Sequence, residues 1–465
     1  TGDDPNLPSV KYLQIWTYKG STFHLGAGTY VLGDDATNGL EMNFKGGVGE
    51  SYCTVRILGG YPAGGGSERN ISANVTKFSG DGKYHILTVK DRARLDIDGI
   101  TFCDAFFNGD CSVSAAKMGA ALFLTDSFNN TNSDSQRTAH EKGAARVNLT
   151  DCIFENNRNE SANVDIYYGG GSAIALQKGY LHANRCRFLN NGDKGYIGCV
   201  TTCGNYDFEN LKSELFLNAC LFEGNTTAAG HNVTGHVLNH NTKGILLGVY
   251  NCTFKGNDKP AEDGSVYNTN VIAIRRTSIV ANTTIYQATH GLNQAKEEWT
   301  GYPVRLNGGV SGFNRHIFAN NILQSTPDSN GKGDYRSFSL VDAYSTALDG
   351  KVFFKGNNIM SIVYGPNTTG EGMYKTDSDE TIFNANKNLK MTWSESLGVF
   401  EWDAEETRYT NMSKARMEEI LQSSDIDNDN VSNSHFKWGT TFYKWLKSID
   451  AVDRDALGNT RPSEG

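Results

Sequence analysis

LTDCIFENN, residues 149–157, places a phenylalanine two residues after a cysteine and an asparagine three residues after that. The same word returns as ANRCRFLNN (183–191), LNACLFEGN (217–225) and VYNCTFKGN (249–257). The four cysteines of the word are separated by 34, 34 and 32 residues: Cys152, Cys186, Cys220 and Cys252. A fixed period of this size indicates a stacked repeat architecture.

The word weakens outside this region without disappearing. We place the following pairs in its cysteine and phenylalanine positions: Thr284 and Tyr286, Asn321 and Leu323, Asn358 and Met360, and, upstream, Ile100 and Phe102. A second short apolar stretch precedes each word, at 120–124, 172–176, 196–200, 236–238, 271–274, 303–306 and 337–340. These segments are rich in alternating or β-branched residues and are bounded by Gly, Asn and Asp, which is typical of short strands.

Two or three short strands per repeat, with no helix between them, predict an all-β fold made of one parallel β-helix. We expect roughly nine to eleven coils, with the right-handed crossover that parallel strands prefer. The cysteines and phenylalanines then form ladders inside the bore. The asparagines Asn157, Asn191, Asn225 and Asn257 are expected to form a turn ladder with positive φ that is hydrogen-bonded along the stack.

The ends of the chain differ from its middle. We expect a lead segment over 1–20, the β-helix over 21–375 and a C-terminal capping region over 376–465. Within that region 411–424 has the pattern of a short amphipathic helix with Ser413 as its N-cap, and 442–449 is a second candidate. A partly helical cap over the last coil follows.

Composition excludes some classes of function. The formal net charge is −9, so binding to nucleic acid has no electrostatic support, and an anionic polymer would need a local basic site. No apolar run is long enough to span a bilayer. The chain opens TGDDPNLPSV, which we interpret as a mature start after an export signal, or as the segment behind a lipid anchor. We therefore expect a secreted or outer-membrane-surface protein, and a monomer.

The nine cysteines are interpreted mainly as small buried hydrophobes with inert thiols. A disulfide between Cys199 and Cys203, or between Cys103 and Cys111, is the alternative. The CxxxC spacing is followed by no second Cys or His pair, so no zinc or other metal site is expected.

The motifs resemble known families. GGGSAI (169–174) and the series FENN, FLNN, FEGN, FKGN resemble the GGAI and FxxN repeats of chlamydial-type polymorphic outer-membrane proteins. LGAGTYVL (25–32), ILGGYPAGGG (57–66) and VDRDALGNTRP (452–462) resemble secreted β-helix surface proteins of Bacteroidetes-like bacteria. The resemblance implies the right-handed, pectin-lyase-like β-helix superfamily, which includes lyases, glycoside hydrolases and non-catalytic adhesins.

One column of residues is a candidate for catalysis. Gln177, Thr201, His240, Arg275, Asn307 and Asp342 follow successive apolar stretches and would align on an outer face. In a lyase, His240 would be the base, Arg275 the carboxylate clamp and Asp342 the cation ligand, with Arg305 adding positive charge. Calcium would be the cofactor in that case, and otherwise none is expected. The alternative is an ordinary polar exposed face.

A sugar-stacking platform is the second candidate site. Trp299 and Tyr302 lie in the loop 293–302, and aromatic rings pack against the apolar faces of sugars. The alternative is a loop anchor on the solenoid.

The residues leave two functions open. The first is a secreted or cell-surface, adhesin-like protein that binds glycans or the surfaces of host or neighbouring cells without catalysis. The second is an extracellular polysaccharide lyase or glycoside hydrolase that acts on an outer β-helix face. No acid–base set of the kind that polygalacturonases carry is visible, so the sequence does not decide whether the chain is an enzyme.

Overall fold

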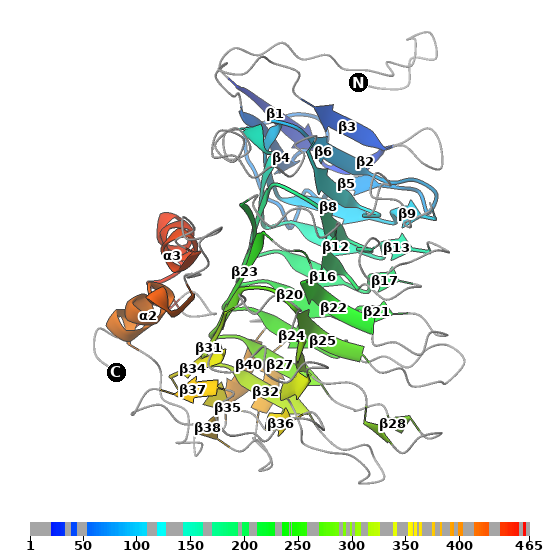
Figure 1. Cartoon of the computed structure of the whole chain (residues 1–465). Helices are drawn as coiled ribbons and strands as arrows, with labels where there is room; N and C mark the ends of the chain where they lie inside the picture. The colour runs from blue at the N-terminus through cyan, green and yellow to red at the C-terminus, as the bar shows by residue number, and fades with distance from the viewer. Residues whose placement is uncertain are drawn as a thin grey trace.

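Each coil of the chain crosses three parallel sheets in the same order, and each strand pairs with its counterpart one coil away (Figure 1). The computed structural model describes residues 20–32, 39–43, 54–108, 119–126, 143–160, 170–193, 198–203, 212–227, 235–240, 242, 244–257, 269–287, 292–293, 298–299, 303–307, 315–325, 338–341, 352–356, 358–359, 362–364, 374–376, 382–383, 391–394, 399–402, 413–426, 438–454 and 459–461. Over this part of the chain the fold is a parallel β-helix, which confirms the predicted class.

Sheet A contains eleven described strands: β1 Ser21–Gly26, β4 Thr54–Tyr61, β7 Arg94–Asp98, β11 Arg146–Thr150, β15 Tyr180–Asn184, β19 Ser213–Asn218, β23 Ile245–Tyr250, β26 Ser278–Ala281, β31 His316–Ala319, β34 Val352–Lys355 and β37 Tyr374–Thr376. Sheet B contains eleven: β2 Gly28–Val31, β5 Thr76–Ser79, β8 Ile100–Cys103, β12 Ile153–Glu155, β16 Arg187–Leu189, β20 Leu221–Glu223, β24 Thr253–Lys255, β27 Thr284–Gln287, β32 Ile322–Ser325, β35 Asn358–Ile359 and β38 Ile382–Phe383. Sheet C contains ten: β3 Leu40–Asn43, β6 Leu87–Lys90, β10 Leu122–Thr125, β14 Ile174–Leu176, β18 Val200–Thr202, β22 Gly235–His240, β25 Thr269–Ile274, β30 Val304–Asn307, β33 Phe338–Val341 and β36 Ile362–Tyr364.

The remaining described elements are short. A side sheet joins β9 Phe106–Phe107, β13 Arg158–Asn159, β17 Gly192–Asp193 and β21 Thr226–Thr227. Two antiparallel pairs are β28 Leu292–Asn293 with β29 Glu298–Trp299, and β39 Met391–Ser394 with β40 Val399–Trp402. The helical elements are α2 Lys414–Leu421, η2 Ser424–Ile426 and α3 Trp438–Ser448.

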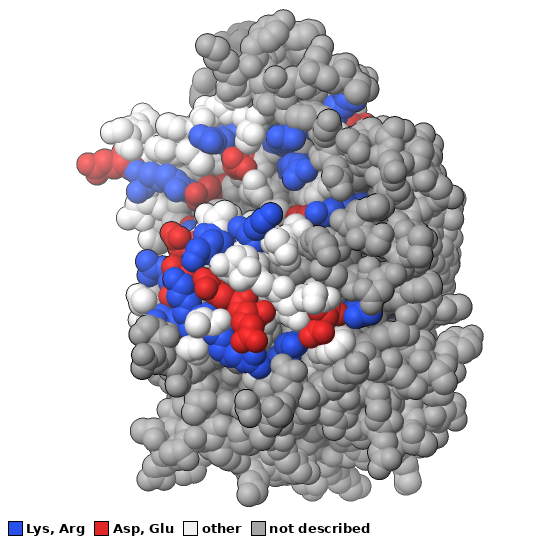
Figure 2. Space-filling view, turned by 60° about the vertical axis from the view of Figure 1, so that its left-hand side comes forward, with Lys and Arg blue, Asp and Glu red and all other residues white. Residues whose placement is uncertain are grey.

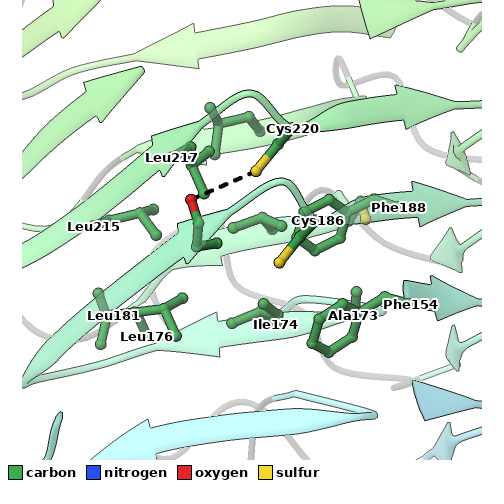
Figure 3. Close-up of a cluster of buried hydrophobic side chains, with 14 of the residues drawn as sticks. Phe154, Ala173, Ile174, Leu176, Leu181, Cys186, Phe188, Leu215, Leu217 and Cys220 are labelled. Atoms are coloured by element: carbon green, nitrogen blue, oxygen red, sulfur yellow. Dashed lines mark hydrogen bonds between the residues drawn. The ribbon is translucent and has the colours of Figure 1, made fainter. Parts of the chain in front are cut away.

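The phenylalanines of the repeated word form the predicted ladder in the bore. Phe154 and Phe188 stack at 5.1 Å between ring centroids, and Phe188 and Phe222 at 4.4 Å, with ring planes within 10°. Phe254 continues the stack, and all four rings are fully buried. Figure 3 shows Phe154 and Phe188 one above the other. Each such pair contributes about 0.5–1.5 kcal/mol beyond the burial of its apolar area.

The asparagines form the predicted ladder, but without positive φ. The side-chain amide of Asn157 donates to Asn191 Oδ1 at 2.8 Å, and that of Asn191 donates to Asn225 Oδ1 at 2.9 Å. The left-handed backbone belongs to the preceding residue, for example Asn156 and Asn190. That residue turns the chain, so the following asparagine points into the bore, where its amide bonds to the next coil.

The cysteines of the word lie buried beside the phenylalanine ladder. Cys220 Sγ donates to the carbonyl of Ala183 at 3.6 Å, the dashed contact in Figure 3. Burial raises the pKa of the Cys186 and Cys220 thiols well above the ordinary value, so both stay protonated.

The described cysteines bear out the interpretation as buried thiols. Cys103, Cys199 and Cys203 are buried thiols that form no disulfide, so the alternative pairing of Cys199 with Cys203 is wrong. Cys111, the other half of the second alternative, lies outside the described residues.

The register of one downstream coil differs from the prediction by one residue. Ile285, and not Tyr286, pairs with Phe254, so Thr283 takes the cysteine position. Further along, Asn321 and Leu323 lie where they were predicted. The word is ambiguous here because two threonines follow Asn282 and either one fits the cysteine position.

The C-terminal helices are present, but they do not cover the last coil. In Figure 1, α2 and α3 lie beside the stack at the level of its middle coils. The described residues 413–426, 438–454 and 459–461 are called here the C-terminal segment. Apolar side chains of both its helices pack against outward residues of sheet A. Ser413 caps α2 as predicted, with its hydroxyl accepting from the amide of Arg416 at 3.3 Å.

Several coils hold this C-terminal segment in place. Lys355 forms an ion pair with Asp425 at 2.9 Å, and Arg461 donates to Asn251 at 3.1 Å. Because β34 carries Lys355 and the turn after β23 carries Asn251, the segment ties together coils that are far apart in the stack.

Gly248 makes room for this docking. It lies on the outward side of β23, and a Cβ atom there would overlap the ring of Phe442 from α3. Phe442 also contacts Phe216 of the neighbouring strand, with 4.8 Å between ring centroids. Glycine on this strand is therefore required by the close approach of the helix.

Sheet C places His240 inside the bore. Its register partners on the neighbouring coils are Thr202 and Ile274, in the same inward row as Leu176. The ring is fully buried, and its Nε2 donates to the carbonyl of Thr277 at 3.2 Å. Nδ1 therefore accepts, from the Thr202 hydroxyl at 3.3 Å.

The prediction of an outward His240 was therefore wrong. The apolar stretch 236–238 suggested that the strand ends at Leu238, but β22 continues to His240. Because side chains alternate along a strand, His240 points to the same side as Leu238. Burial lowers the pKa of His240 from 6.5 to about 3, with the Thr277 carbonyl opposing this shift and Arg276 adding to it.

Replacing Gly248 with alanine should displace α3. We expect Gly248→Ala to lower the free energy of unfolding by about 1–3 kcal/mol, because the new methyl group overpacks against Phe442. Hydrogen exchange of the α3 amides should accelerate. The matched control is Gly192→Ala, whose Cβ would meet Thr226 Oγ1 at an ordinary 3.6 Å. Equal α3 exchange in the two variants would contradict this account of the docking.

Replacing His240 with leucine should reduce the sensitivity of the fold to acid. The pKa of His240 is depressed in the folded protein, so its contribution to stability is fully present above pH 6.5. That contribution is lost progressively as the pH falls from 6.5 toward about 3. The expected loss is roughly 1.4 kcal/mol per pH unit. His240→Leu should reduce the slope of the unfolding free energy against pH by up to the equivalent of one proton taken up on unfolding. It should also lower stability at neutral pH by about 1–3 kcal/mol, because the hydrogen bonds of the ring are lost.

Urea unfolding between pH 7 and 5 would measure the slope for His240→Leu and for His24→Leu, a change at an exposed histidine. An unchanged slope in His240→Leu would show that His240 is not the group that responds.

Candidate functional site

Of the three predicted catalytic residues, the structure describes His240 and Arg275. His240 lies in the bore, and the backbone amide of Arg275, a half-buried residue directly after β25, donates to the His240 carbonyl at 2.8 Å. The predicted column is also out of register, because Thr201 pairs with Asn239 and not with His240. Asp342 lies outside the described residues.

The predicted ligand-binding residues are spread over sheet C and a loop hairpin. Arg305 is half-buried in β30, where it pairs with Ala273. Trp299 lies in β29 and pairs with Leu292 of β28, and Tyr302 lies outside the described residues.

A different set of residues comes together on the outer face of sheet A. Parallel register places side chains of successive coils in rows that run along the solenoid. The Arg–Tyr row consists of Thr54, Arg94, Arg146, Tyr180 and Glu214. The Asp–His row consists of Thr22, Arg56, Asp96, Asn148 and His182. Both rows point outward because Leu95 and Ile97, which alternate with them on β7, are buried in the bore.

The Arg–Tyr row brings two cations together. Arg94 and Arg146 are directly paired on neighbouring strands, both half-buried. The guanidinium of Arg146 also lies over the ring of Tyr180, 3.8 Å from its centroid, and so is held in a fixed place.

The Asp–His row supplies polar groups next to this pair. Asp96 accepts a hydrogen bond from Asn148 at 2.8 Å and forms an ion pair with Arg56 at 3.5 Å. We call the residues Thr22, Arg56, Arg94, Asp96, Arg146 and Asn148 the open face. It carries three arginines and one carboxylate, so it is locally positive on a protein of net charge −9.

A packed cluster lies at one end of the open face. His182 Nε2 and Glu214 Oε2 are 2.9 Å apart, and Lys212 approaches Glu214 Oε1 at 3.7 Å. The His182 ring is stacked on Phe216, with centroids 4.9 Å apart, and is tilted against Trp445 of α3 at 5.1 Å. His182 is thus held on two sides by aromatic rings and at its edge by a carboxylate.

Charge of both signs surrounds this region. In Figure 2, lysine and arginine lie next to aspartate and glutamate over the described part of this side of the molecule, and neither sign forms a broad patch. Asp151, for example, is paired by two hydrogen bonds from Arg185 at 2.7 and 2.8 Å. The open face therefore attracts anions only at short range.

The alternation of residues in the strand before each word could have revealed these rows. ARLDID (93–98), ARVNLT (145–150) and YLHAN (180–184) each alternate buried and outward residues. Apart from Arg94 and Arg146, the outward residues differ from coil to coil, so they add little to the repeat signal of the sequence.

None of the described helices is both long and apolar enough to cross a membrane. The described His, Cys, Asp and Glu side chains form no group of three or more that could hold a metal ion.

No family model matches the chain, and no curated protein matches it. Among solved structures, the chain is similar to the bacteriophage CBA120 tailspike protein 3 (TSP3, orf212), with 11% identity and a TM-score of 0.32, over 82% of this chain and 62% of the tailspike. The chain thus spans less than two thirds of the tailspike's length. It is also similar to a mannuronic acid specific polysaccharide family 6 lyase from human gut microbiota, with 12% identity and a TM-score of 0.26, over 93% of this chain and 94% of the lyase. Similarities this low carry no statement about what this chain binds.

Proposed function

We propose that the protein binds an acidic glycan on the open face of sheet A. The observation that carries this proposal is the direct pairing of Arg94 and Arg146 on neighbouring coils. Two guanidinium groups in this position both attract an anionic group that binds between them. Arginine suits the task because its planar fork matches carboxylate and sulfate groups with two parallel hydrogen bonds.

The surroundings of the pair suit a sugar polymer. Arg56 and Asn148 are exposed and offer hydrogen-bond donors for hydroxyl groups. Trp445, half-buried at the end of the face, offers part of an aromatic ring against which the apolar side of a sugar can pack. Rows of side chains that follow the solenoid suit an extended ligand with repeating units.

Binding without catalysis fits the packed cluster better than cleavage. A general base must reach the proton that it removes. Tyr180 is only 4% exposed and lies under Arg146, while His182 is enclosed by Phe216 and Trp445. These contacts hold the groups as parts of a wall and do not present them to a substrate.

The proposal implies a place of action. Polymeric acidic glycans are found at cell surfaces and outside cells, so we infer a secreted or surface-attached, adhesin-like protein that acts as a monomer. A net charge of −9 opposes indiscriminate binding of polyanions and leaves recognition to the arginine pair.

Removing one arginine of the pair should weaken glycan binding. We expect Arg146→Ala to raise the Kd for an acidic polysaccharide about ten- to a hundredfold, the equivalent of about 1.5–3 kcal/mol for charge-assisted hydrogen bonds. Binding to polygalacturonate, polymannuronate and heparin would be measured by affinity electrophoresis and calorimetry, with dextran and pullulan as neutral polymers.

The matched control is Arg187→Ala, which removes an exposed arginine from the outer side of sheet B. It should leave the affinity unchanged. Equal weakening by both substitutions, or binding by none of the three acidic polymers, would refute an acidic-glycan site on sheet A.

A second candidate function, polysaccharide cleavage, is favoured by one observation. Tyr180, His182 and Glu214 lie on two adjacent coils next to the arginine pair, and Tyr or His as base with Arg as carboxylate clamp suits lyase chemistry. In that case calcium would be held with the help of the substrate's own carboxylates.

Incubation with the same acidic polymers tests the second candidate. Binding alone predicts no unsaturated uronide and no new reducing ends, because no base reaches the sugar. Ultraviolet absorbance and a reducing-end assay would measure the products, with and without calcium. Cleavage by the wild type that is lost in Tyr180→Phe, with glycan binding retained, would establish the lyase in place of the binder.

A further inference from the structure

The Asp–His row is exposed at the end away from α3 and largely buried at the end next to α3. The side chain of Arg56 is 62% exposed and that of Asp96 is 35% exposed, and Asn148 is also exposed. Only 15% of His182 is exposed, and Phe216 on the next coil is fully buried. The row is therefore open at one end and closed at the other.

Helix α3 forms the closed end. Trp445 contacts both His182 and Phe216, and Phe442 fills the space above Gly248 on the following strand. Lys212 adds a hydrogen bond to Thr441 at 3.3 Å. The helix thus lies on the outer face of sheet A directly after the open face ends.

The length of the open face limits what it can hold. From Thr22 to Asn148 the row crosses four coils, which at about 4.8 Å per coil spans roughly 14 Å. This is the length of a short oligosaccharide. A longer chain that follows the row would meet α3, which with its side chains is about 10 Å thick.

We propose that the site binds the end of a glycan chain and not its middle. The terminal sugar lies against Trp445 and His182, and the preceding sugars run back over Arg146, Arg94 and Arg56. A chain that passed through the site would have to rise over α3 and leave the sheet. This inference rests on the proposed acidic-glycan site and adds to it the form of the ligand.

Counting chain ends tests the inference. The polymers are polygalacturonate, polymannuronate and heparin. For each one, inhibition of binding per unit mass by the intact polymer would be compared with inhibition by its partial hydrolysate, cut to fragments longer than the open face. End binding predicts that inhibition per unit mass rises in proportion to the number of chain ends. Equal potency per unit mass would show binding within the chain and overturn the inference, while the acidic-glycan site would stand. Binding of none of the three polymers or their fragments would overturn both.

A pair of variants on α3 tests the end wall itself. Trp445→Ala should weaken binding of the fragments roughly three- to tenfold, as expected for loss of one stacking contact. Tyr443→Ala, on the same helix, is the matched control, since its hydroxyl contacts Glu418 of α2 and not the open face. Circular dichroism and thermal melting would verify that α3 stays docked. Unchanged affinity in a docked Trp445→Ala protein would overturn the role of α3 as an end wall.

Discussion

The asparagine ladder is the interaction that fixes the register of the coils that carry the repeated word. Asn157, Asn191 and Asn225 each bond to the next asparagine through the side-chain amide, and the backbone amide donates to the same oxygen at 3.0–3.2 Å. A slip of one residue would break every bond of this ladder and turn each strand's side chains to the opposite face. The stacked phenylalanines fill the bore, but stacking tolerates small displacements, whereas paired hydrogen bonds do not.

The same register that orders the bore also creates the rows outside it. Side chains at inward positions must match those of the neighbouring coils in shape, so the same residue types repeat from coil to coil. This repetition made the fold, the bore and its ladders predictable from the sequence. Outward positions carry no such constraint. Equivalent positions of the Arg–Tyr row hold unlike residues such as Thr54, Tyr180 and Glu214, so repetition alone does not reveal the site. The prediction of His240 as an outward base failed for a related reason, because the end of β22 was placed two residues too early.

The position of the C-terminal segment could not be derived from local sequence. An amphipathic pattern predicts that a helix buries one face, and it does not say against what. The surface of sheet A against which the helices dock forms only on folding, when Phe216, Gly248 and Ile279 of three strands come to lie in one row. Polar residues precede them in the same row and apolar ones occupy the stretch beneath the helices, so the two parts of the sheet surface are specialised for solvent and for docking.

The charge of the protein and the charge of the open face act over different distances. At physiological ionic strength the Debye length is about 8 Å, so acidic groups elsewhere on the surface are screened from an anion at the site. Arg94 and Arg146 are one coil apart, about 4.8 Å, and act on such an anion together. An acidic solenoid can thus hold an acidic ligand, provided that the cations are adjacent and fixed. The register of the coils makes them adjacent, and the contact of Arg146 with Tyr180 fixes one of them.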